Sequence, residues 1–327
     1  MMSKLNLLEV HHLSTAFESE VGWLRAVDDV SFCVPRGQCV GIVGESGCGK
    51  SVTAMSLVRL LPRPSGRILE GRVLFDGEDI LKMKPRRLND VRGGKIGVIF
   101  QEPMSALNPV HRIGDQIAET LMLHRGMSRD HAWLEAINML HFVRIPDPEH
   151  RVKEFPGSLS GGMRQRVGIA IALACRPELI IADEPTTALD VTVQQQILSL
   201  IRELREQMGS SAVLITHDLG VIAQNCDRVV VMYAGRVVES AGVKELFANP
   251  RHAYTKALLS SMPRLEYPRK SHLPTIPGQV APIRDYVMGC RFCQRLERTG
   301  HTLVTRPPMV QVGPDHLVEA CPLCADI

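Results

Sequence analysis

Short apolar runs alternate with longer helix-like segments over most of the chain. Residues 8–16 and 26–34 hold apolar runs that suit an antiparallel β edge, and residues 38–44 are β-branched and apolar at their centre, as in a buried strand. A glycine-rich turn follows this strand, and then a helix-like segment, residues 51–61, which ends at Pro62. This order predicts a strand, a loop and a helix near the start of the chain.

The same alternation continues through the middle of the chain. Further strands are predicted at residues 96–100, 179–182, 212–215, 228–232 and 236–239. Helices are predicted at residues 162–174 and 192–207, and a helical subdomain is predicted at about residues 102–163. Strands that alternate with helices favour a mostly parallel sheet with helices on both faces. We therefore predict an α/β fold with an antiparallel β edge.

The periodic pattern stops at about Pro263. Beyond it the chain is rich in proline and charge and shows little periodicity. We therefore predict one domain over residues 1–262 and a small extension that contains four cysteines over residues 263–327.

Composition and charge narrow the class of protein. Apolar residues make up 45% of the 327 residues and aromatic residues only 4%, so the core should be aliphatic. The formal net charge of +3 is nearly balanced, and we expect no nucleic-acid partner. The longest apolar stretch, residues 167–175, is far shorter than the roughly 20 residues of a membrane-spanning helix, and the first residues do not resemble a signal peptide. We therefore expect a cytosolic protein with reduced thiols.

The first chemical motif is the glycine-rich loop after the predicted buried strand. Its sequence, Gly44-Glu45-Ser46-Gly47-Cys48-Gly49-Lys50-Ser51, fits the pattern G-x-x-x-x-G-K-[ST]. Glycines let backbone N–H groups curl around a phosphate, and the helix N-terminus adds partial positive charge. We expect Lys50 to reach the β- and γ-phosphates of ATP and the Ser51 hydroxyl to bind Mg²⁺. The strand before this loop and the helix after it argue against a chance glycine turn.

Two carboxylates end the predicted strand at residues 179–182. Asp183 and Glu184 follow it directly, at the sheet edge where α/β proteins bind ligands. We expect Asp183 to hold Mg²⁺ through water, and Glu184 to orient and polarise the attacking water. Taken alone, this motif is also consistent with an acidic surface pair.

A second anion-binding helix end is predicted at Leu159-Ser160-Gly161-Gly162-Met163-Arg164-Gln165. Ser160 is a good N-cap, and the two glycines expose backbone N–H groups. One ATP does not need two such sites in one subunit, so each would face the other half of a dimer. With this motif, which matches L-S-G-G-x-x-Q, the sequence resembles the ABC ATPase family over residues of about 5–260. The resemblance implies a P-loop NTPase core that hydrolyses ATP with Mg²⁺ and closes as a dimer on two ATP, with Ser160, Gly161, Gly162 and Gln165 among the nucleotide-binding residues.

The resemblance implies further site residues. Gln101 matches the Q-loop glutamine, which contacts Mg²⁺ and the attacking water, and Asp190 ends the segment 188–190 that matches the D-loop. His217 matches the switch histidine that contacts the γ-phosphate, although a lone histidine at a strand end is more often structural. The ring that stacks on adenine is assigned to Phe17, with Trp23 as the alternative.

Several segments resemble one branch of the family, the importers of oligopeptides, dipeptides and nickel. These segments are residues 101–109, 185–192 and 250–259, in the last of which Ala253 stands where the branch usually has proline. Glu45 fits the same branch. Val52, which we count with the nucleotide-binding residues, resembles the dipeptide D-type ATPase.

The resemblance also implies partners and a location. It favours a heterodimer with a second ATPase subunit over a homodimer, and it adds two integral membrane permease subunits and an extracytoplasmic solute-binding protein. The protein would lie peripherally on the cytoplasmic face of the inner cell membrane. Di- or oligopeptides are the expected cargo, although nickel complexes and opine-like or glycosidic solutes use the same type of ATPase. ABC proteins that act on DNA or ribosomes carry a long coiled coil or two cassettes, and the single cassette and importer-like end argue against these and against an exporter.

Four of the nine cysteines form two C-x-x-C pairs near the end of the chain, Cys290 with Cys293 and Cys321 with Cys324. The importer branch often carries four cysteines there that hold a [4Fe-4S] cluster, but with a wider first spacing and an earlier third cysteine. The spacing found here suits tetrahedral zinc at least as well. The cluster, favoured by the resemblance, zinc and reduced structural thiols all stay open; a cytosolic disulfide is least favoured. A metal would hold residues of about 285–327 together, and we expect the ATPase core, whose motifs all precede them, to be independent of it.

Overall fold

The computed structural model describes residues 5–101, 107–187, 189–262 and 274–326 of the chain. The chain divides into two units. The first comprises residues 1–7, 34–38 and 82–215, and the second comprises residues 8–33, 39–81 and 216–327. Each unit therefore combines segments that are far apart in the sequence. No helix in the described part of the chain is both long and apolar enough to cross a bilayer.

Three parallel strands pair with one another in the first unit. In spatial order they are β8 (Ser211–Thr216), β7 (Leu179–Asp183) and β6 (Ile96–Ile99). In the parallel register Ile181 lies between Val98 and Val213. Every residue of β7 and β8 is buried. Strands that are covered on both faces are apolar throughout, which is why the sequence pattern predicted these two.

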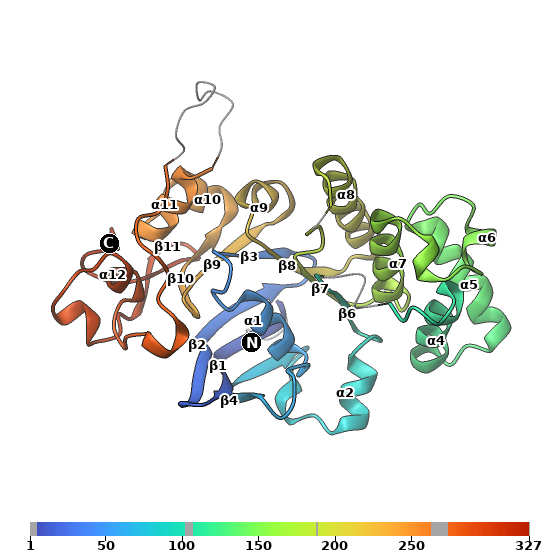
Figure 1. Cartoon of the computed structure of the whole chain (residues 1–327), viewed down its shortest axis with the longest axis horizontal. Helices are drawn as coiled ribbons and strands as arrows, with labels where there is room; N and C mark the ends of the chain where they lie inside the picture. Colours follow the sequence, from blue (N-terminus) through green and yellow to red (C-terminus); the bar gives the residue numbers. More distant parts are fainter. Residues whose placement is uncertain (1–4, 102–106, 188, 263–273, 327) are drawn as a thin grey trace. The chain divides into compact units, whose positions relative to one another are not determined.

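The described part of the first unit also contains helices. They are α2 (Pro85–Val91), α4 (Ile113–Arg125), α5 (Arg129–Phe142), α6 (Pro148–Arg151), η3 (Pro156–Ser158), α7 (Gly161–Leu173) and α8 (Val191–Met208). α4, α5 and α7 contact one another and lie side by side in Figure 1, which confirms a helical subdomain in this part of the chain. Gly126, at a φ of 64°, ends α4, and Ser128 caps α5, so the chain reverses direction between them.

The second unit contains an antiparallel sheet, as the two first apolar runs predicted. In spatial order its strands are β2 (Gly22–Pro35), β1 (Asn6–Ser19), β4 (Gly66–Phe75) and β5 (Glu78–Asp79). Leu8 lies opposite Phe75 in the register of β1 and β4. The pattern did not predict β4, because only part of this strand is buried.

Five further strands of this unit pair in mixed directions, and they include the strand that leads into the glycine-rich loop. In spatial order they are β3 (Cys39–Val43), β9 (Arg228–Tyr233), β10 (Arg236–Gly242), β12 (His316–Glu319) and β11 (Met309–Gly313). β3 and β9 are parallel, and the remaining neighbours are antiparallel. The helical segments are α1 (Lys50–Leu57), η2 (Ile80–Lys82), α9 (Leu219–Asn225), α10 (Val243–Ala248), α11 (Ala253–Ser260), η4 (Ile283–Asp285), α12 (Arg291–Arg295) and η5 (His301–Leu303).

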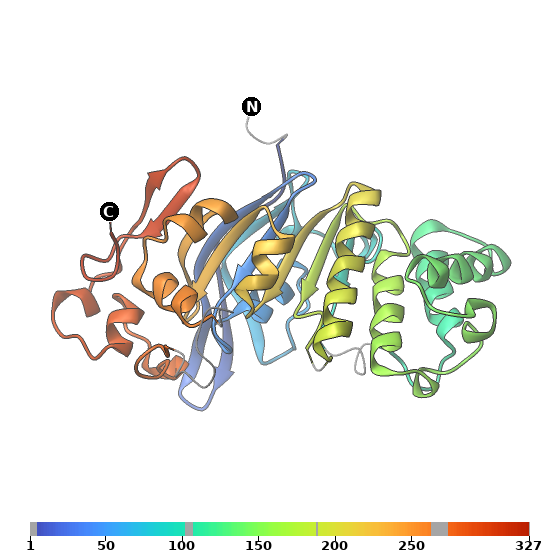
Figure 2. The same cartoon turned by 90° about the horizontal axis from the view of Figure 1, so that it is seen from above.

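The end of the chain is part of the sheet and core of the second unit. β12 pairs with β10, with Val318 opposite Glu239, and Phe292 of α12 packs in one buried cluster with Tyr233 and Tyr254. Figures 1 and 2 show this segment, in red, beside α10 and α11. β11 and β12 are short, and β11 is partly exposed, so periodicity alone could not predict them. β12 pairs with β10 and β11 pairs with β12, which stabilises both strands. The predicted boundary at Pro263 lies in residues 263–273, outside the described residues.

Candidate functional site

The glycine-rich loop begins directly after β3, whose five residues are all buried. A Cβ atom on Gly44 would lie 2.2 Å from the carbonyl oxygen of Met232, so only glycine fits there. Gly49 adopts a φ of 101°, and a Cβ on it would lie 2.8 Å from the carbonyl oxygen of Ala26. The backbone of β9 and of β2 therefore fixes the loop in a tight path that side chains at these two positions would block.

Lys50 lies across this loop. Its side chain is only 4% exposed, and its Nζ donates hydrogen bonds to the carbonyl oxygens of Gly44, at 2.9 Å, and Glu45, at 3.0 Å. The ammonium group is thus held inside the curve of the loop, at the N-terminus of α1. Burial raises the pKa of Cys48 to about 11, so this thiol remains neutral beside Lys50. The loop, which Ser51 and Val52 continue into α1, is therefore suited to bind an anion.

The first unit brings together two residues that were predicted to be catalytic. Asp183 ends β7 and is 5% exposed. Glu184 follows with a φ of 42°, a left-handed conformation that is strained for a non-glycine residue, and its N–H donates to the carbonyl oxygen of Ile215 at 3.0 Å. Gln101 donates from Nε2 to Glu184 Oε2 at 3.4 Å. The side chain of Gln101 therefore reaches the carboxylate that was predicted to hold the attacking water.

The start of α7 lies beside the start of α8. Ser160 caps α7 by accepting a hydrogen bond from the N–H of Met163 at 3.3 Å, and Asp190 caps α8 by accepting one from Val193 at 2.9 Å. A Cβ on Gly162 would lie 3.0 Å from Val193 Cγ1. Ser160 and Gly161 are exposed at this helix end. The two motifs predicted to act across a dimer thus form one surface of the first unit; residue 188 of the second motif lies outside the described residues.

The remaining predicted residues lie in different environments. Gln165 is buried, at 2% exposed, whereas His217 is exposed just after β8. The ring of Phe17 lies against Gly66, and the guanidinium of Arg67 covers the Trp23 ring at 3.9 Å from its centroid. These contacts are compatible with either aromatic residue stacking on adenine, so this assignment stays a prediction. Residues 102–106 of the importer-like segment 101–109 lie outside the described residues.

Sequence reasoning missed two residues that touch the glycine-rich loop. Arg295 of α12 donates from Nη1 to Glu45 Oε2 at 2.5 Å, and the Tyr254 hydroxyl accepts a hydrogen bond from the N–H of Glu45 at 3.0 Å. Arg295 also donates to the carbonyl oxygens of residues 276, 277 and 278. The position of Arg295, two residues after Cys293, was the only signal available, and it does not indicate a partner 250 positions away.

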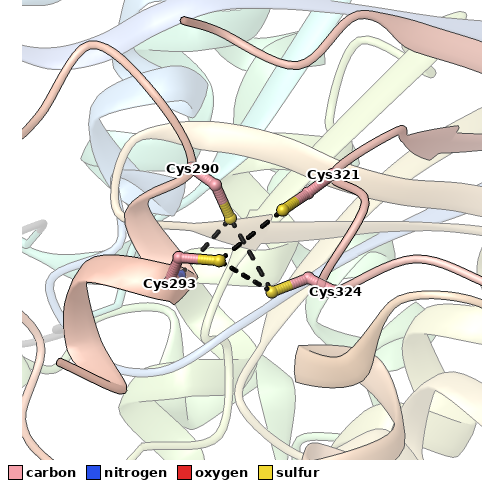
Figure 3. A group of neighbouring side chains, drawn as sticks. All are labelled: Cys290, Cys293, Cys321 and Cys324. Carbon is pink, nitrogen blue, oxygen red and sulfur yellow. Dashed lines mark hydrogen bonds between the residues drawn. The ribbon is translucent and has the colours of Figure 1, made fainter. Parts of the chain in front are cut away.

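The four cysteines near the end of the chain converge, as Figure 3 shows. We call Cys290, Cys293, Cys321 and Cys324 the cysteine site. All four are buried, and their sulfur atoms lie within 4.8 Å of one another. The separations are 3.8 Å for Cys290 and Cys324, 3.6 Å for Cys293 and Cys321, and 3.4 Å for Cys293 and Cys324. Thiolates are the ligands that zinc and iron–sulfur clusters prefer, so the residues present fit a metal centre.

A buried histidine lies against the cysteine site. His252 is fully buried, and its Nδ1 accepts a hydrogen bond from the N–H of Tyr254 at 3.1 Å, which leaves the ring proton on Nε2. Nε2 has no hydrogen-bond partner within the described residues, and His252, Cys290 and Glu319 form a second group whose ligand atoms lie within 4.8 Å of one another. The contact of Cys290 with Cys324 is the main reason that the pKa of Cys290 is lowered. Cys290 is therefore suited to carry negative charge.

Comparison with known families identifies the class of protein that these motifs define. Residues 27–187 match the ABC transporter family, and residues 238–300 match the oligopeptide/dipeptide transporter C-terminal region. The chain belongs to the ABC transporter family, as an ATP-hydrolysing subunit with the C-terminal region of the oligopeptide/dipeptide transporters.

Relatives of similar length support this membership. A protein of Sinorhizobium fredii named a probable peptide ABC transporter ATP-binding protein is 50% identical over 95% of this chain and 93% of its own. The oligopeptide transport ATP-binding protein OppD of Bacillus subtilis is 45% identical over 98% of this chain and 90% of its own. A solved dimeric ATP-binding cassette bound to ADP and phosphate is 28% identical, with a TM-score of 0.65, and covers 72% of this chain and 98% of its own.

Proposed function

We propose that this chain powers the import of di- or oligopeptides by binding and hydrolysing ATP as one half of a dimer. The observation that carries the proposal is the contact of Gln101 with Glu184, directly after the buried Asp183, in a family of ATP-hydrolysing subunits. The relatives named for peptide, oligopeptide and dipeptide transport support the class of cargo. In this proposal residues 1–262 are the nucleotide-binding domain and residues 263–327 its extension.

Each motif has a defined part in the proposed reaction. The loop from Gly44 to Ser51, continued by Val52, holds the phosphates, and Lys50 supplies positive charge to the β- and γ-phosphates. Mg²⁺ would be held by Ser51, Gln101 and Asp183, and it would neutralise charge on the phosphates. Glu184 accepts a proton from the attacking water, Gln101 orients that water, and His217 contacts the γ-phosphate.

The dimer follows from the second anion-binding surface. Ser160, Gly161 and Gly162 present the exposed start of α7, and Asp190 lies beside it. We propose that this surface, with Gln165 behind it, closes on the ATP held by the partner ATPase. The solved dimeric cassette with ADP and phosphate supports such a dimer. Closure on two ATP would move the membrane subunits, and hydrolysis would release them.

The proposed assembly contains partners that this chain does not supply. They are a second ATPase subunit, which we propose to be a different protein, two membrane permease subunits and an extracytoplasmic solute-binding protein. This ATPase would lie on the cytoplasmic face of the cell membrane. ATP-dependent uptake of a labelled peptide by vesicles that contain the complete complex tests the cargo, with a nickel complex as the competing solute.

The loop assignment is tested by Lys50→Ala. We expect ATP affinity to fall by roughly 10- to 100-fold, because a charge-assisted hydrogen bond contributes about 1.5–3 kcal/mol. Equilibrium binding of a fluorescent ATP analogue to the full chain measures this. The matched control is Lys95→Ala, which removes a partly exposed lysine that pairs with Glu178. Wild-type affinity in Lys50→Ala would show that the loop does not bind the phosphates of ATP.

A further inference from the structure

We propose that the cysteine site holds a single zinc ion in place of the [4Fe-4S] cluster typical of the importer branch. Four thiolates around one tetrahedral zinc, with Zn–S bonds of about 2.3 Å, lie about 3.8 Å from one another. Three of the sulfur separations, 3.4 Å for Cys293 and Cys324, 3.6 Å for Cys293 and Cys321 and 3.8 Å for Cys290 and Cys324, agree with that spacing. A four-iron cluster places eight atoms between its thiolates and needs sulfur atoms much farther apart. The cysteine site has no room for that cage.

The sequence spacing supports the same conclusion. Each C-x-x-C pair lies on one short turn: Cys290 caps α12 and Cys293 lies within it, while the N–H of Cys324 donates to the carbonyl oxygen of Cys321 at 3.0 Å. Two such turns, facing each other, supply two sulfur atoms each, which is the usual arrangement of a structural zinc site. All four thiols are buried, so no position is open to water or substrate.

Groups around the cysteine site fit a centre with excess negative charge. Four thiolates and one Zn²⁺ carry a net charge of −2. Arg298 donates from Nη1 to Cys324 Sγ at 3.6 Å, and His252 forms a group with Cys290 and Glu319 whose ligand atoms lie within 4.8 Å of one another. Hydrogen-bond donors of this kind orient metal ligands and stabilise their charge. The Nε2–H of His252, which is buried and has no hydrogen-bond partner among the described residues, is assigned the role of such a donor in this proposal.

Metal analysis of the full chain, purified without oxygen and without an affinity tag, tests this assignment. We expect a colourless protein with one zinc per chain. Replacement of zinc by Co²⁺ should give the strong visible absorption of tetrahedral cobalt bound to thiolates. Brown protein with iron and sulfide would overturn the proposal, and so would one iron without sulfide. Metal-free protein in which all four thiols react while the chain is folded would also overturn it.

A second inference rests on a different observation, the contact of the extension with the glycine-rich loop. We infer that Arg295 is a positioning residue for ATP binding and acts through Glu45. The side chain of Arg295 is buried, at only 5% exposed, whereas the side chain of Glu45 is 30% exposed. α12, which carries Arg295, begins at Cys290 and contains Cys293. The cysteine site therefore holds in place the helix that contacts the loop.

Charge explains why this contact affects nucleotide binding. Glu45 is a carboxylate within a loop that is proposed to bind the negative phosphates of ATP. Arg295 neutralises this carboxylate, and the hydrogen bond from Glu45 N–H to Tyr254 fixes the backbone beside it. Without Arg295, the Glu45 side chain would be free to turn toward the phosphates and repel them. The loss should therefore weaken ATP binding more than it slows the chemical step.

Kinetics and binding of three variants test this inference. Arg295→Met should raise both the Kd and the KM for ATP about tenfold, with kcat changed less than about twofold. Adding Glu45→Gln to that variant should restore most of the affinity, because the repelling charge is gone. Arg295→Lys should keep part of the wild-type affinity for ATP, since lysine still pairs with Glu45 but cannot donate hydrogen bonds to the same set of carbonyl oxygens. The matched control is Arg306→Met, which breaks another ion pair between the extension and the rest of the second unit, with Asp29 at 2.8 Å.

The outcomes separate this inference from the function on which it rests. If the double variant binds ATP as weakly as Arg295→Met, then Arg295 acts only on the stability of the extension and the inference is wrong. The same holds if Arg306→Met weakens ATP binding equally. If neither Arg295→Met nor Lys50→Ala changes the affinity for ATP, the assignment of the loop to phosphate binding itself fails. If Lys50→Ala weakens ATP binding but Arg295→Met binds ATP normally, only the positioning role of Arg295 is overturned.

Discussion

Glu184→Gln is expected to lower ATP turnover by about 100-fold or more while ATP still binds, because a general base contributes about 10²–10⁴-fold to a rate. Glutamine has the same shape and still accepts the hydrogen bond that Gln101 donates. An amide, however, cannot take a proton from water. The strained backbone of Glu184, at a φ of 42°, holds the side chain at the end of β7 whichever residue is present. The variant should therefore accumulate in the ATP-bound state.

Turnover is measured on the complete transporter complex, and ATP affinity by equilibrium binding. We expect the ATP-bound variant to remain a stable dimer during size-exclusion chromatography. Glu203→Gln is the matched control, since it removes a carboxylate of the same unit that pairs with Arg144. Hydrolysis by Glu184→Gln at more than about a tenth of the normal rate would show that another group activates the water.

Of the substitutions proposed, Cys321→Ser is expected to cause the largest loss of folding stability in the extension. A structural zinc site contributes on the order of 10 kcal/mol of binding free energy at neutral pH, and three thiolates hold zinc far less tightly than four. The cysteine site links α12 to the end of the chain, and the extension contacts the rest of the second unit through the pairing of β12 with β10 and the packing of α12. The variant should therefore lose its zinc on dialysis against a chelator, and the segment from about residue 285 to the end should then become sensitive to protease.

The same variant tests whether ATP binding depends on the cysteine site. The sequence alone led us to expect that the ATPase core would be independent of it. Because α12 carries Arg295, loss of zinc should also raise the Kd for ATP, by about as much as Arg295→Met does. Cys33→Ser is the matched control: it changes a half-buried cysteine of β2 and should keep both zinc and ATP affinity. Full stability and normal zinc content in Cys321→Ser would show that Cys321 is not a metal ligand.

The sequence predicted most elements that are covered on both faces. β3, β7 and β8 are continuous apolar runs, and α7 and α8 carry the buried stripes that helical periodicity predicts. It could not predict β11 and β12, two short strands that pair with each other and, through β12, with β10. Burial in a layer leaves a pattern in the sequence, whereas addition of a short strand to a sheet edge depends on a partner elsewhere in the chain.

Local motifs determined what chemistry this protein can carry out, because each needs only neighbouring residues. The anion site expected at the loop from Gly44 to Ser51 needs only the backbone of that loop, and Asp183 and Glu184 follow a single strand. Only the tertiary structure decided which distant groups meet. It placed Gln101 against Glu184, brought four sulfur atoms within 4.8 Å of one another, and paired Arg295 with Glu45. Such contacts depend on how far the fold brings separate segments together, and residue spacing along the chain does not encode that distance.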